Sequence, residues 1–282
     1  MSDRSTADLP RERDRGFALL FVLWTMVLLA LIATHIAAVG RTEARLAGNL
    51  RDAAIAEAAA DGAVHEAIFH LLGGGGRWSP TGRHRVQLPD AAVDVTVENL
   101  AGRVNPNVAS PELLRALLRE LGADARRAAS LADAIMDWRT PGRTARPYGA
   151  KAPEYRAAGR EDGPPGAPFR HLDELGAVLG MTPEVLASLR PHLTLWWDDE
   201  PDPAVAGPVV LAALRATGGE EEASGGDRPG VVLAVAVTAE ATGPHGSRFV
   251  RRATVEIVPS ARGGGSWRLL DWGVLDGGVP SP

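Results

Sequence analysis

Residues 15–39 read RGFALLFVLWTMVLLALIATHIAAV, and this stretch decides how the rest of the chain must be arranged. From Phe17 to Val39 the only titratable side chain is that of His35. A helix of these 23 residues, rising 1.5 Å per residue, crosses the roughly 30 Å hydrocarbon core of a bilayer. The stretch therefore predicts a membrane-spanning helix near the start of the chain.

Three kinds of N-terminal segment contain such a run. A cleaved secretory signal has an apolar core of about 7 to 15 residues and a small-x-small cleavage motif, which this longer run matches poorly. An uncleaved signal anchor fits its length. The third kind is suggested by Arg15-Gly16 followed directly by Phe17 and an unbroken apolar helix, which resembles the class III leader of type IV pilins and type II secretion pseudopilins. That resemblance implies a leader at residues 1–16, cleavage between Gly16 and Phe17 by prepilin peptidase, methylation of the new N-terminus, and a periplasmic bulk.

Phe21 departs from the pattern of most pilin-like subunits. It is the fifth residue counted from Phe17, where most of these subunits have Glu. An apolar residue there resembles the K subunit of type II secretion, and that likeness implies a place at the filament tip. The alternative is that Phe21 is simply another side chain that faces lipid.

The helical pattern continues beyond the span. Apolar residues recur every three or four positions from Arg41 to Leu72, which is typical of an amphipathic helix. Together the two parts predict one helix of about 55 residues, roughly 80 Å long. We expect Gly73–Gly76 to end it, because glycine has no helical preference and supplies the dihedral angles of a helix end.

Strand patterns occur on both sides of a helical middle. In 91–98, valines alternate with polar residues, which predicts a sheet with one face on a core. The other predicted strands are 83–88, 231–239 and 249–258, the last two joined by a turn at 243–246. The predicted division is a transmembrane half at 17–39, amphipathic helix and first strands at 40–100, helices at 101–225, and closing strands with a tail at 226–282. Trp267 and Trp272 suggest that part of the tail docks on the body.

The middle segment carries several helix-start signals. Ser110 before Pro111, Asp124, and Thr182 are predicted N-caps. Residues 140–168 form a long irregular stretch, followed by a helix opening at 169–175. Residues 179–186 resemble a helix-hairpin-helix, but so few basic residues lie near the turn that a structural hairpin is favoured over nucleic-acid binding.

A weak internal repeat relates two parts of this segment. NPNVASPELLRALL at 105–118 aligns without gaps on DPAVAGPVVLAALR at 202–215, with identity at seven of 14 positions. The repeat predicts that a turn followed by a helix is used twice. Chance similarity in an Ala- and Leu-rich chain is the alternative.

Four segments taken together give a more specific resemblance. They are 102–118 (GRVNPNVASPELLRALL), 131–139 (LADAIMDWR), 146–159 (RPYGAKAPEYRAAG) and 168–195 (PFRHLDELGAVLGMTPEVLASLRPHLTL). In order and spacing this block is similar to type II secretion system protein K. The resemblance implies an α+β fold: a pilin-like long helix on an antiparallel sheet, into which a large all-helical (SAM-like or helix-hairpin) domain is inserted.

The same resemblance implies a function and a location. It indicates a minor pseudopilin in the bacterial inner membrane, with a single span and a periplasmic bulk. Its place would be the pseudopilus tip, where it would help initiate assembly and the export of folded proteins. Its partners would be the other minor pseudopilins and prepilin peptidase, with secreted substrates or the secretin as further contacts. The alternative is a membrane-anchored periplasmic binding module that uses the helical hairpins to hold a ligand or nucleic acid.

The K family commonly binds calcium in the segment after its Asp-Trp pair. Here Asp137 is present, but Thr140 and Gly142 stand where the family often has acids, and Lys151 where it often has Glu. Asp137, Glu154 and Asp162 are the remaining weak candidates, and calcium prefers six to eight oxygen ligands. We therefore expect no cofactor, and a loop held by packing around its aromatic residues Trp138, Tyr148 and Tyr155.

Composition and motifs disfavour the other function classes. The formal net charge is -5 with acids and bases interspersed, so no polybasic face for nucleic acid is predicted. The chain contains no cysteine, which excludes disulfides, thiolate zinc sites and a cysteine nucleophile. No G-x-S-x-G, H-E-x-x-H or P-loop motif occurs, and adjacent acids such as Asp198-Asp199 do not converge on one substrate atom. The sequence predicts that the protein is not an enzyme.

Overall fold

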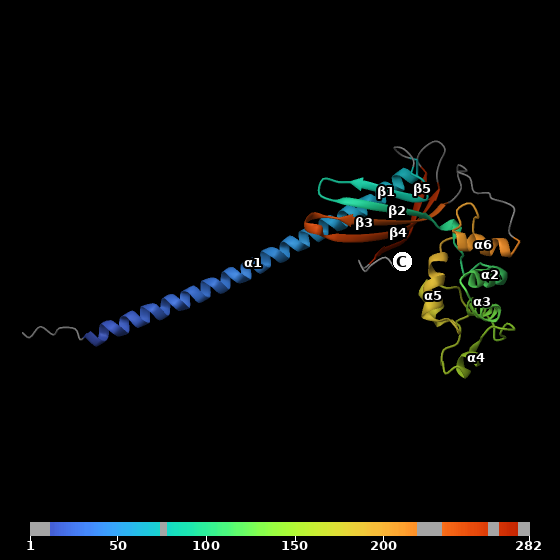
Figure 1. Ribbon diagram of the computed structural model, residues 1–282, viewed down its shortest axis with the longest axis horizontal. Coiled ribbons are helices and arrows are strands. Elements are labelled where there is room, and N and C mark those ends of the chain that lie inside the picture. The colour runs from blue at the N-terminus through green and yellow to red at the C-terminus, as the bar shows by residue number, and fades with distance from the viewer. Residues whose placement is uncertain (1–11, 74–77, 219–232, 259–264, 276–282) are drawn as a thin grey trace, which may run out of the picture.

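A single long helix, α1 (Glu12–Leu71), runs through the first quarter of the chain. The computed structural model describes residues 12–73, 78–218, 233–258 and 265–275, and within them the side chains of all but 12–16, 18 and 37–42. With 60 residues, α1 is about 90 Å long at the standard helical rise. It ends just before Gly73, which has φ 94°, as predicted; Gly74–Gly76 lie outside the described residues. The first half of α1 projects away from the rest of the molecule, and the second half lies along a sheet (Figure 1).

The sheet has five strands in the order β1-β2-β3-β4-β5, and each neighbouring pair is antiparallel. The strands are β1 (Gly82–Gln87), β2 (Ala92–Asn99), β3 (Leu233–Thr242), β4 (Arg248–Val258) and β5 (Ser266–Val274). The first four confirm the predicted strands, apart from 231–232 at the start of the third, which lie outside the described residues. The predicted turn at 243–246 contains the short 3-10 helix η4 (Pro244–Gly246).

The second half of α1 covers one face of the sheet. Val93, Val95 and Val97 alternate inward from β2 and are buried against the helix. The helix contributes mainly small side chains to this contact, Ala56, Ala60, Ala63, Val64 and Ala67. Small residues let the helix backbone lie close to the sheet, so the core is dense although few large side chains fill it. The predicted α+β class, with a long N-terminal helix on an antiparallel sheet, is confirmed.

All the other α-helices among the described residues lie between β2 and β3 in the chain, yet β2 and β3 are neighbours in the sheet. The α-helices are α2 (Pro111–Glu120), α3 (Ala125–Arg139), α4 (Ala152–Ala157), α5 (Pro183–Leu189) and α6 (Pro208–Ala216). Short 3-10 helices are η1 (Leu100–Gly102), η2 (Leu172–Ala177) and η3 (Arg190–His192). They gather beyond one end of the sheet, away from the projecting part of α1 (Figure 1).

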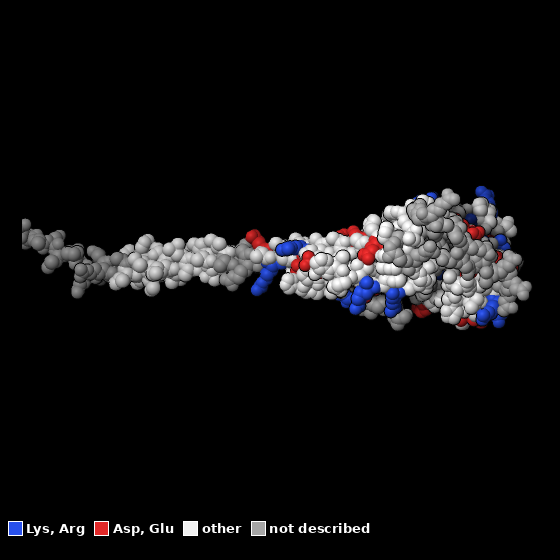
Figure 2. Space-filling model, turned by 90° about the horizontal axis from the view of Figure 1, so that it is seen from above, with Lys and Arg blue, Asp and Glu red and all other residues white. Residues whose placement is uncertain are grey.

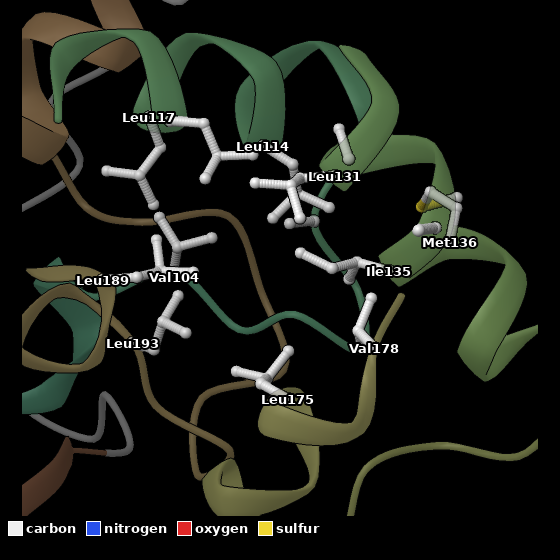
Figure 3. Close-up of a cluster of buried hydrophobic side chains, with 14 of the residues drawn as sticks. Val104, Leu114, Leu117, Leu131, Ile135, Met136, Leu175, Val178, Leu189 and Leu193 are labelled. Atoms are coloured by element: carbon white, nitrogen blue, oxygen red, sulfur yellow. The ribbon is translucent and has the colours of Figure 1, made fainter. Parts of the chain in front are cut away.

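These helices have a hydrophobic core of their own. Leucines on the inner side of α2 meet Leu131 and Ile135 of α3 (Figure 3). Leu175, Val178, Leu189 and Leu193 close the same core from the opposite side (Figure 3). The core does not include the residues that pack α1 on the sheet. The helical part thus buries its own apolar surface.

The three predicted N-caps are present. Ser110 Oγ accepts from the backbone N–H of Leu113 at 3.1 Å, Asp124 Oδ1 accepts from two N–H groups, and Thr182 Oγ1 accepts from Val185. Two predictions were wrong in detail. The stretch 140–168 is not wholly irregular, because it contains α4, and the helix expected at 169–175 is only the 3-10 helix η2.

The predicted repeat exists as a structural repeat. Asn105 Oδ1 accepts from the N–H of Asn107 at 2.9 Å, and Asp202 Oδ1 accepts from Ala204 at the same distance. In both copies the first residue's carbonyl also accepts from the N–H four residues on, and a helix then begins at the proline. The turn and helix that the repeat predicts are therefore present in both segments.

β5 was not predicted as a strand. It pairs along β4, with a register shift between Thr254 and Val255. The docking suggested by its tryptophans is present, since Trp267 and Trp272 both contact the ring of His65 on α1. Residues 276–282 of the predicted tail lie outside the described residues.

Candidate functional site

The first half of α1 is a candidate membrane anchor. Leu19–Ile36 is the one segment in the described part of the chain that is long and apolar enough to cross a bilayer, and none of it is buried. In Figure 2 this part of the helix carries no charged side chain, and charges begin where it approaches the sheet. The hydroxyls of Thr25 and Thr34 donate to carbonyls of the preceding turn. They therefore need no partner in lipid.

The predicted processing junction lies within this helix. α1 begins at Glu12 and continues through Gly16 and Phe17, so the helix starts before the junction rather than after it. The side chains of Phe17 and Phe21 are 76% and 64% exposed. Residues 1–11 of the predicted leader lie outside the described residues. Cleavage between Gly16 and Phe17 stays a prediction.

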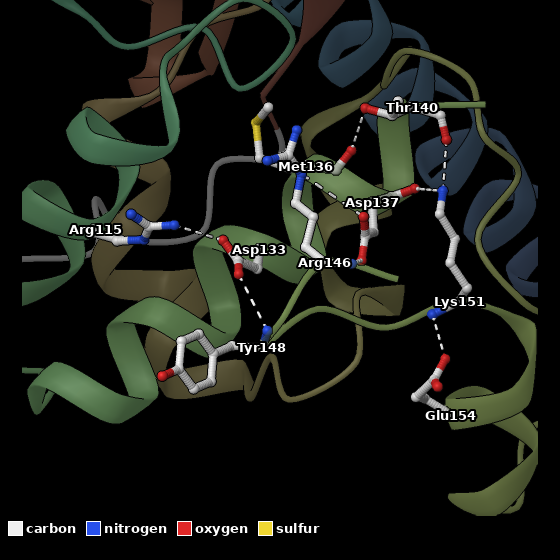
Figure 4. Close-up of polar contacts among 9 residues, drawn as sticks. All are labelled: Arg115, Asp133, Met136, Asp137, Thr140, Arg146, Tyr148, Lys151 and Glu154. Carbon is white, nitrogen blue, oxygen red and sulfur yellow. Dashed lines mark hydrogen bonds and ion pairs between the residues drawn. The ribbon is translucent and has the colours of Figure 1, made fainter. Parts of the chain in front are cut away.

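Two acidic residues of α3, Asp133 and Asp137, are buried one turn apart. Asp133 accepts from the guanidinium of Arg115 at 2.8 Å and from the backbone N–H of Tyr148 at 3.2 Å. Asp137 accepts from the N–H of Arg146 at 3.0 Å, and the Arg146 guanidinium lies 3.8 Å away (Figure 4). The two carboxylates therefore hold the loop 140–151 against α3.

Lys151 completes this arrangement from the far end of the loop. Its side chain is buried, and its ammonium donates to the backbone carbonyls of Asp137 and, at 2.6 Å, Thr140 (Figure 4). Its backbone N–H donates to the Glu154 carboxylate at 2.8 Å, which starts α4. One side chain thus joins the end of α3 to the start of α4.

The residues present do not fit a calcium site. The Asp137 carboxylate is used by Arg146, Glu154 caps α4, and Asp162 is exposed and belongs to no cluster with them. Within the described ranges there is no group of three or more His, Asp or Glu side chains that could hold a metal ion. Two carbonyls that could serve as hard ligands already accept from Lys151.

Aromatic packing supports the rest of the loop. Trp138 stacks on Phe169 with ring centroids 5.7 Å apart, and the backbone of Phe169 exchanges two hydrogen bonds with the Asn107 amide. The buried hydroxyl of Tyr155 accepts from the N–H of Leu179 at 2.9 Å. Burial raises the pKa of Tyr155, because the phenolate is poorly solvated there. The expectation that Tyr148 packs in this cluster was wrong, since its side chain is 60% exposed.

The helical hairpin at 179–186 offers little to a phosphate. Its turn residue Gly180 has φ 88°, and α5 follows after the Thr182 cap. Arg190, the nearest cation beyond the turn in sequence, is hydrogen-bonded to the carboxylate of Asp173. The charge that a nucleic acid would need there is already paired.

A search of family models matched residues 95–198 to the model described as type II secretion system (T2SS), protein K. The resemblance to type II secretion protein K is confirmed. The matched segment runs from within β2 to six residues beyond η3 and contains the cluster around Lys151. No curated protein matched the chain in a sequence search.

Among solved structures, one match is a chain of the crystal structure of the GspK-GspI-GspJ complex from the enterotoxigenic Escherichia coli type 2 secretion system. Identity is 17%, the TM-score is 0.55, and the match covers 84% of this chain and 99% of that chain. At this identity the match shows the fold, and it extends beyond the segment matched by the protein K model. Both findings relate the chain to protein K of type II secretion.

Sequence reasoning missed the residues that hold the protein K segment together. Lys151 was noted only as a departure from the family pattern, and the Arg115–Asp133 pair was not noted at all. A signal was present: Lys151 is the only lysine among 30 Lys and Arg residues. Asp133 and Asp137 also lie on one side of a helix that is otherwise apolar there.

Proposed function

We propose that this chain is a minor pseudopilin at the tip of the type II secretion pseudopilus. It would help initiate pseudopilus assembly and the export of folded proteins across the outer membrane. One observation carries the proposal: a continuous 60-residue helix whose first part is exposed and apolar and whose last part is docked on an antiparallel sheet. Such a helix can pack its free part against equivalent helices of partner subunits.

The helical part supports the tip position. It lies beyond the end of the sheet, adding bulk on the side opposite the projecting helix (Figure 1). We assign residues 101–225 to an inserted all-helical domain, SAM-like in plan, within a pilin-like domain of 40–100 and 226–282. A subunit with this bulk would obstruct stacking above it, whereas at the tip nothing has to stack there.

Processing and location follow from this role. We infer that residues 1–16 are a leader, that prepilin peptidase cleaves between Gly16 and Phe17, and that the new N-terminus is methylated. The span would anchor the protein in the bacterial inner membrane once, with the bulk in the periplasm. The partners would be other minor pseudopilins, with secreted substrates or the secretin as further contacts, and the protein would not be an enzyme.

The alternative, an anchored module that binds a ligand or nucleic acid through helical hairpins, has less support. Arg190 near the hairpin turn is paired with Asp173. The cavity beside the repeat is about 230 Å³ and is lined partly by the acidic residues Asp198, Asp199 and Glu200. A negatively charged lining repels a phosphate backbone.

Mass spectrometry of the mature N-terminus tests the proposal. The chain is expressed with its own prepilin peptidase and recovered from membranes in detergent. We expect the polypeptide to begin at an N-methylated Phe17, and a matched Gly16→Val variant to keep its leader. A wild-type chain that begins at Met1 or Ser2 would count decisively against a processed pseudopilin.

A further inference from the structure

We propose that the ammonium group of Lys151 is a built-in cation that fixes the loop 140–151, so that this loop folds without calcium. Lys151 is the only lysine of the chain, and every other residue among its 30 Lys and Arg is an arginine. The two arginines of this loop are Arg143, which is exposed, and Arg146, which is half-buried, whereas Lys151 is only 4% exposed. The one lysine of the sequence therefore occupies a buried position.

The surroundings of the ammonium favour a cation. Its two acceptors are the main-chain carbonyls of Asp137, in the last turn of α3, and of Thr140, just past its end. The last carbonyls of a helix lack partners within the helix and carry the negative end of its dipole. A positive group there satisfies these acceptors and gains from the field of the helix.

The two buried carboxylates add to the same preference. Asp133 and Asp137 are each less than 3% exposed. Arg115 and Arg146 reach them from the side that faces solvent, with side chains 37% and 39% exposed. A buried charge must be paired or hydrogen-bonded to be tolerated. Lys151 brings a third positive charge to this acidic end of α3 from the interior.

The shape of the lysine side chain suits these two acceptors. Its ammonium is a compact charge with three donors on a flexible stem, so one nitrogen donates to both carbonyls. The one lysine of the chain therefore supplies both hydrogen bonds from a single atom.

The same geometry disfavours a divalent metal. Calcium would need several free carboxylate or carbonyl oxygens, and those at the end of α3 are already used. A calcium ion at the carbonyls of Asp137 and Thr140 would also lie beside the positively charged Lys151 ammonium, which is already hydrogen-bonded to them. We infer that the Lys151 ammonium takes the place that a bound calcium ion would hold. The order of the loop then does not depend on calcium concentration.

Because the chain has one lysine, amine labelling can be read at a single side chain. The full-length protein in detergent is treated with an amine-reactive acetylating reagent, once in calcium chloride and once in EGTA. Peptide mass spectrometry then compares Lys151 with the N-terminal amine. We expect Lys151 to react at least about tenfold more slowly than in the urea-unfolded chain, since labelling requires local opening. The rate should be equal in calcium and in EGTA.

Two outcomes of this labelling would overturn the proposal. Rapid acetylation of Lys151 in the folded chain would mean that the ammonium is not held at the carbonyls. Protection that appears only in calcium would mean that a metal, and not the lysine, orders the loop. Both labelling measurements use the wild-type chain, so neither depends on whether a variant folds.

A charge-removing variant tests the role of the ammonium itself. Lys151→Met keeps an apolar stem but leaves the carbonyls without a donor. We expect chymotrypsin to cleave after the exposed Tyr148 at least about tenfold faster in this variant, because the loop opens more often. The control is Arg143→Met, which removes a charge from an exposed position of the same loop. This variant should be cleaved at the wild-type rate. Equal rates for wild type and Lys151→Met would refute a structural role for the ammonium.

Discussion

At the scale of single residues, Arg251 of β4 connects α1 to the sheet. Its side chain is 7% exposed, and the guanidinium donates to Asp61 at 2.5 Å and to Glu57 at 3.0 Å, both on α1. It also lies over the rings of Phe249 and Trp272, each centroid 4.9 Å away. One side chain thus joins the helix, β4 and β5.

Arg251→Met should destabilise the fold substantially. The variant loses the hydrogen bonds to Asp61 and Glu57, whose side chains are 33% and 51% exposed, and two cation–π contacts; together this should cost about 2 kcal/mol. The control is Arg85→Met, which breaks an ion pair with Asp94 whose side chains are 70% and 61% exposed; surface pairs of this kind add little. Urea unfolding of the full chain in detergent, followed by tryptophan fluorescence, compares the two variants. Equal midpoints for both would mean that Arg251 does not hold the helix to the sheet.

Residue-level features were predictable from sequence only where both partners are local. The caps Ser110, Asp124 and Thr182 follow from spacings of a few residues, and all three are present. The Arg251–Asp61 pair joins residues 190 positions apart, and no local pattern marks it. The Lys151 contacts were partly predictable. The residue stands out in the sequence as the only lysine, but its carbonyl partners can be identified only from the fold.

At the scale of elements, strands and helices with strong periodicity were predicted and weaker ones were not. Alternating valines identify β2, and a leucine stripe identifies α2. β5 lacks alternation, because it pairs at the edge of the sheet and contains a register shift. The single-turn helix α4 is too short to show a period, and its start depends on the contact between Glu154 and Lys151.

The repeat offers a matched test of capping. Its first copy has Ser110 as the N-cap of α2, whereas the second has Gly207 before α6, with no side chain to accept the free N–H groups. We expect Ser110→Ala to destabilise the protein by about 1 kcal/mol and Gly207→Ser to stabilise it by a few tenths. A Cβ at Gly207 meets no atom within 4 Å, so the added side chain has room.

Thermal unfolding of the two single variants measures this difference. The two shifts should have opposite signs, because one variant removes an acceptor and the other adds one at the equivalent position. A Gly207→Ser variant that is less stable than wild type would show that the second copy does not begin its helix as the first one does.

At the scale of the whole molecule, α1 has three parts with different surroundings. Residues 19–36 are apolar and suited to lipid, and residues 56–71 contribute buried side chains to the sheet core. Between them, Leu46 and Leu50 lie one turn apart and are 59% and 64% exposed. Together they give this part of the helix a small exposed apolar surface. Under the proposed function, this surface contacts the helix of a partner pseudopilin.

The double variant Leu46→Gln/Leu50→Gln tests this contact. Glutamine is a good helix former, so the helix should persist, and because both sites are exposed, stability should change by less than about 0.5 kcal/mol. Recovery in the membrane fraction should also match wild type, since the span is untouched. Co-purification with the other minor pseudopilins should fall at least about tenfold, which corresponds to about 1.4 kcal/mol of lost association energy. Val108→Gln, at a 45% exposed site in the helical part, is the control and should leave co-purification unchanged. Undiminished co-purification of the double variant would place the partner contact elsewhere on the molecule.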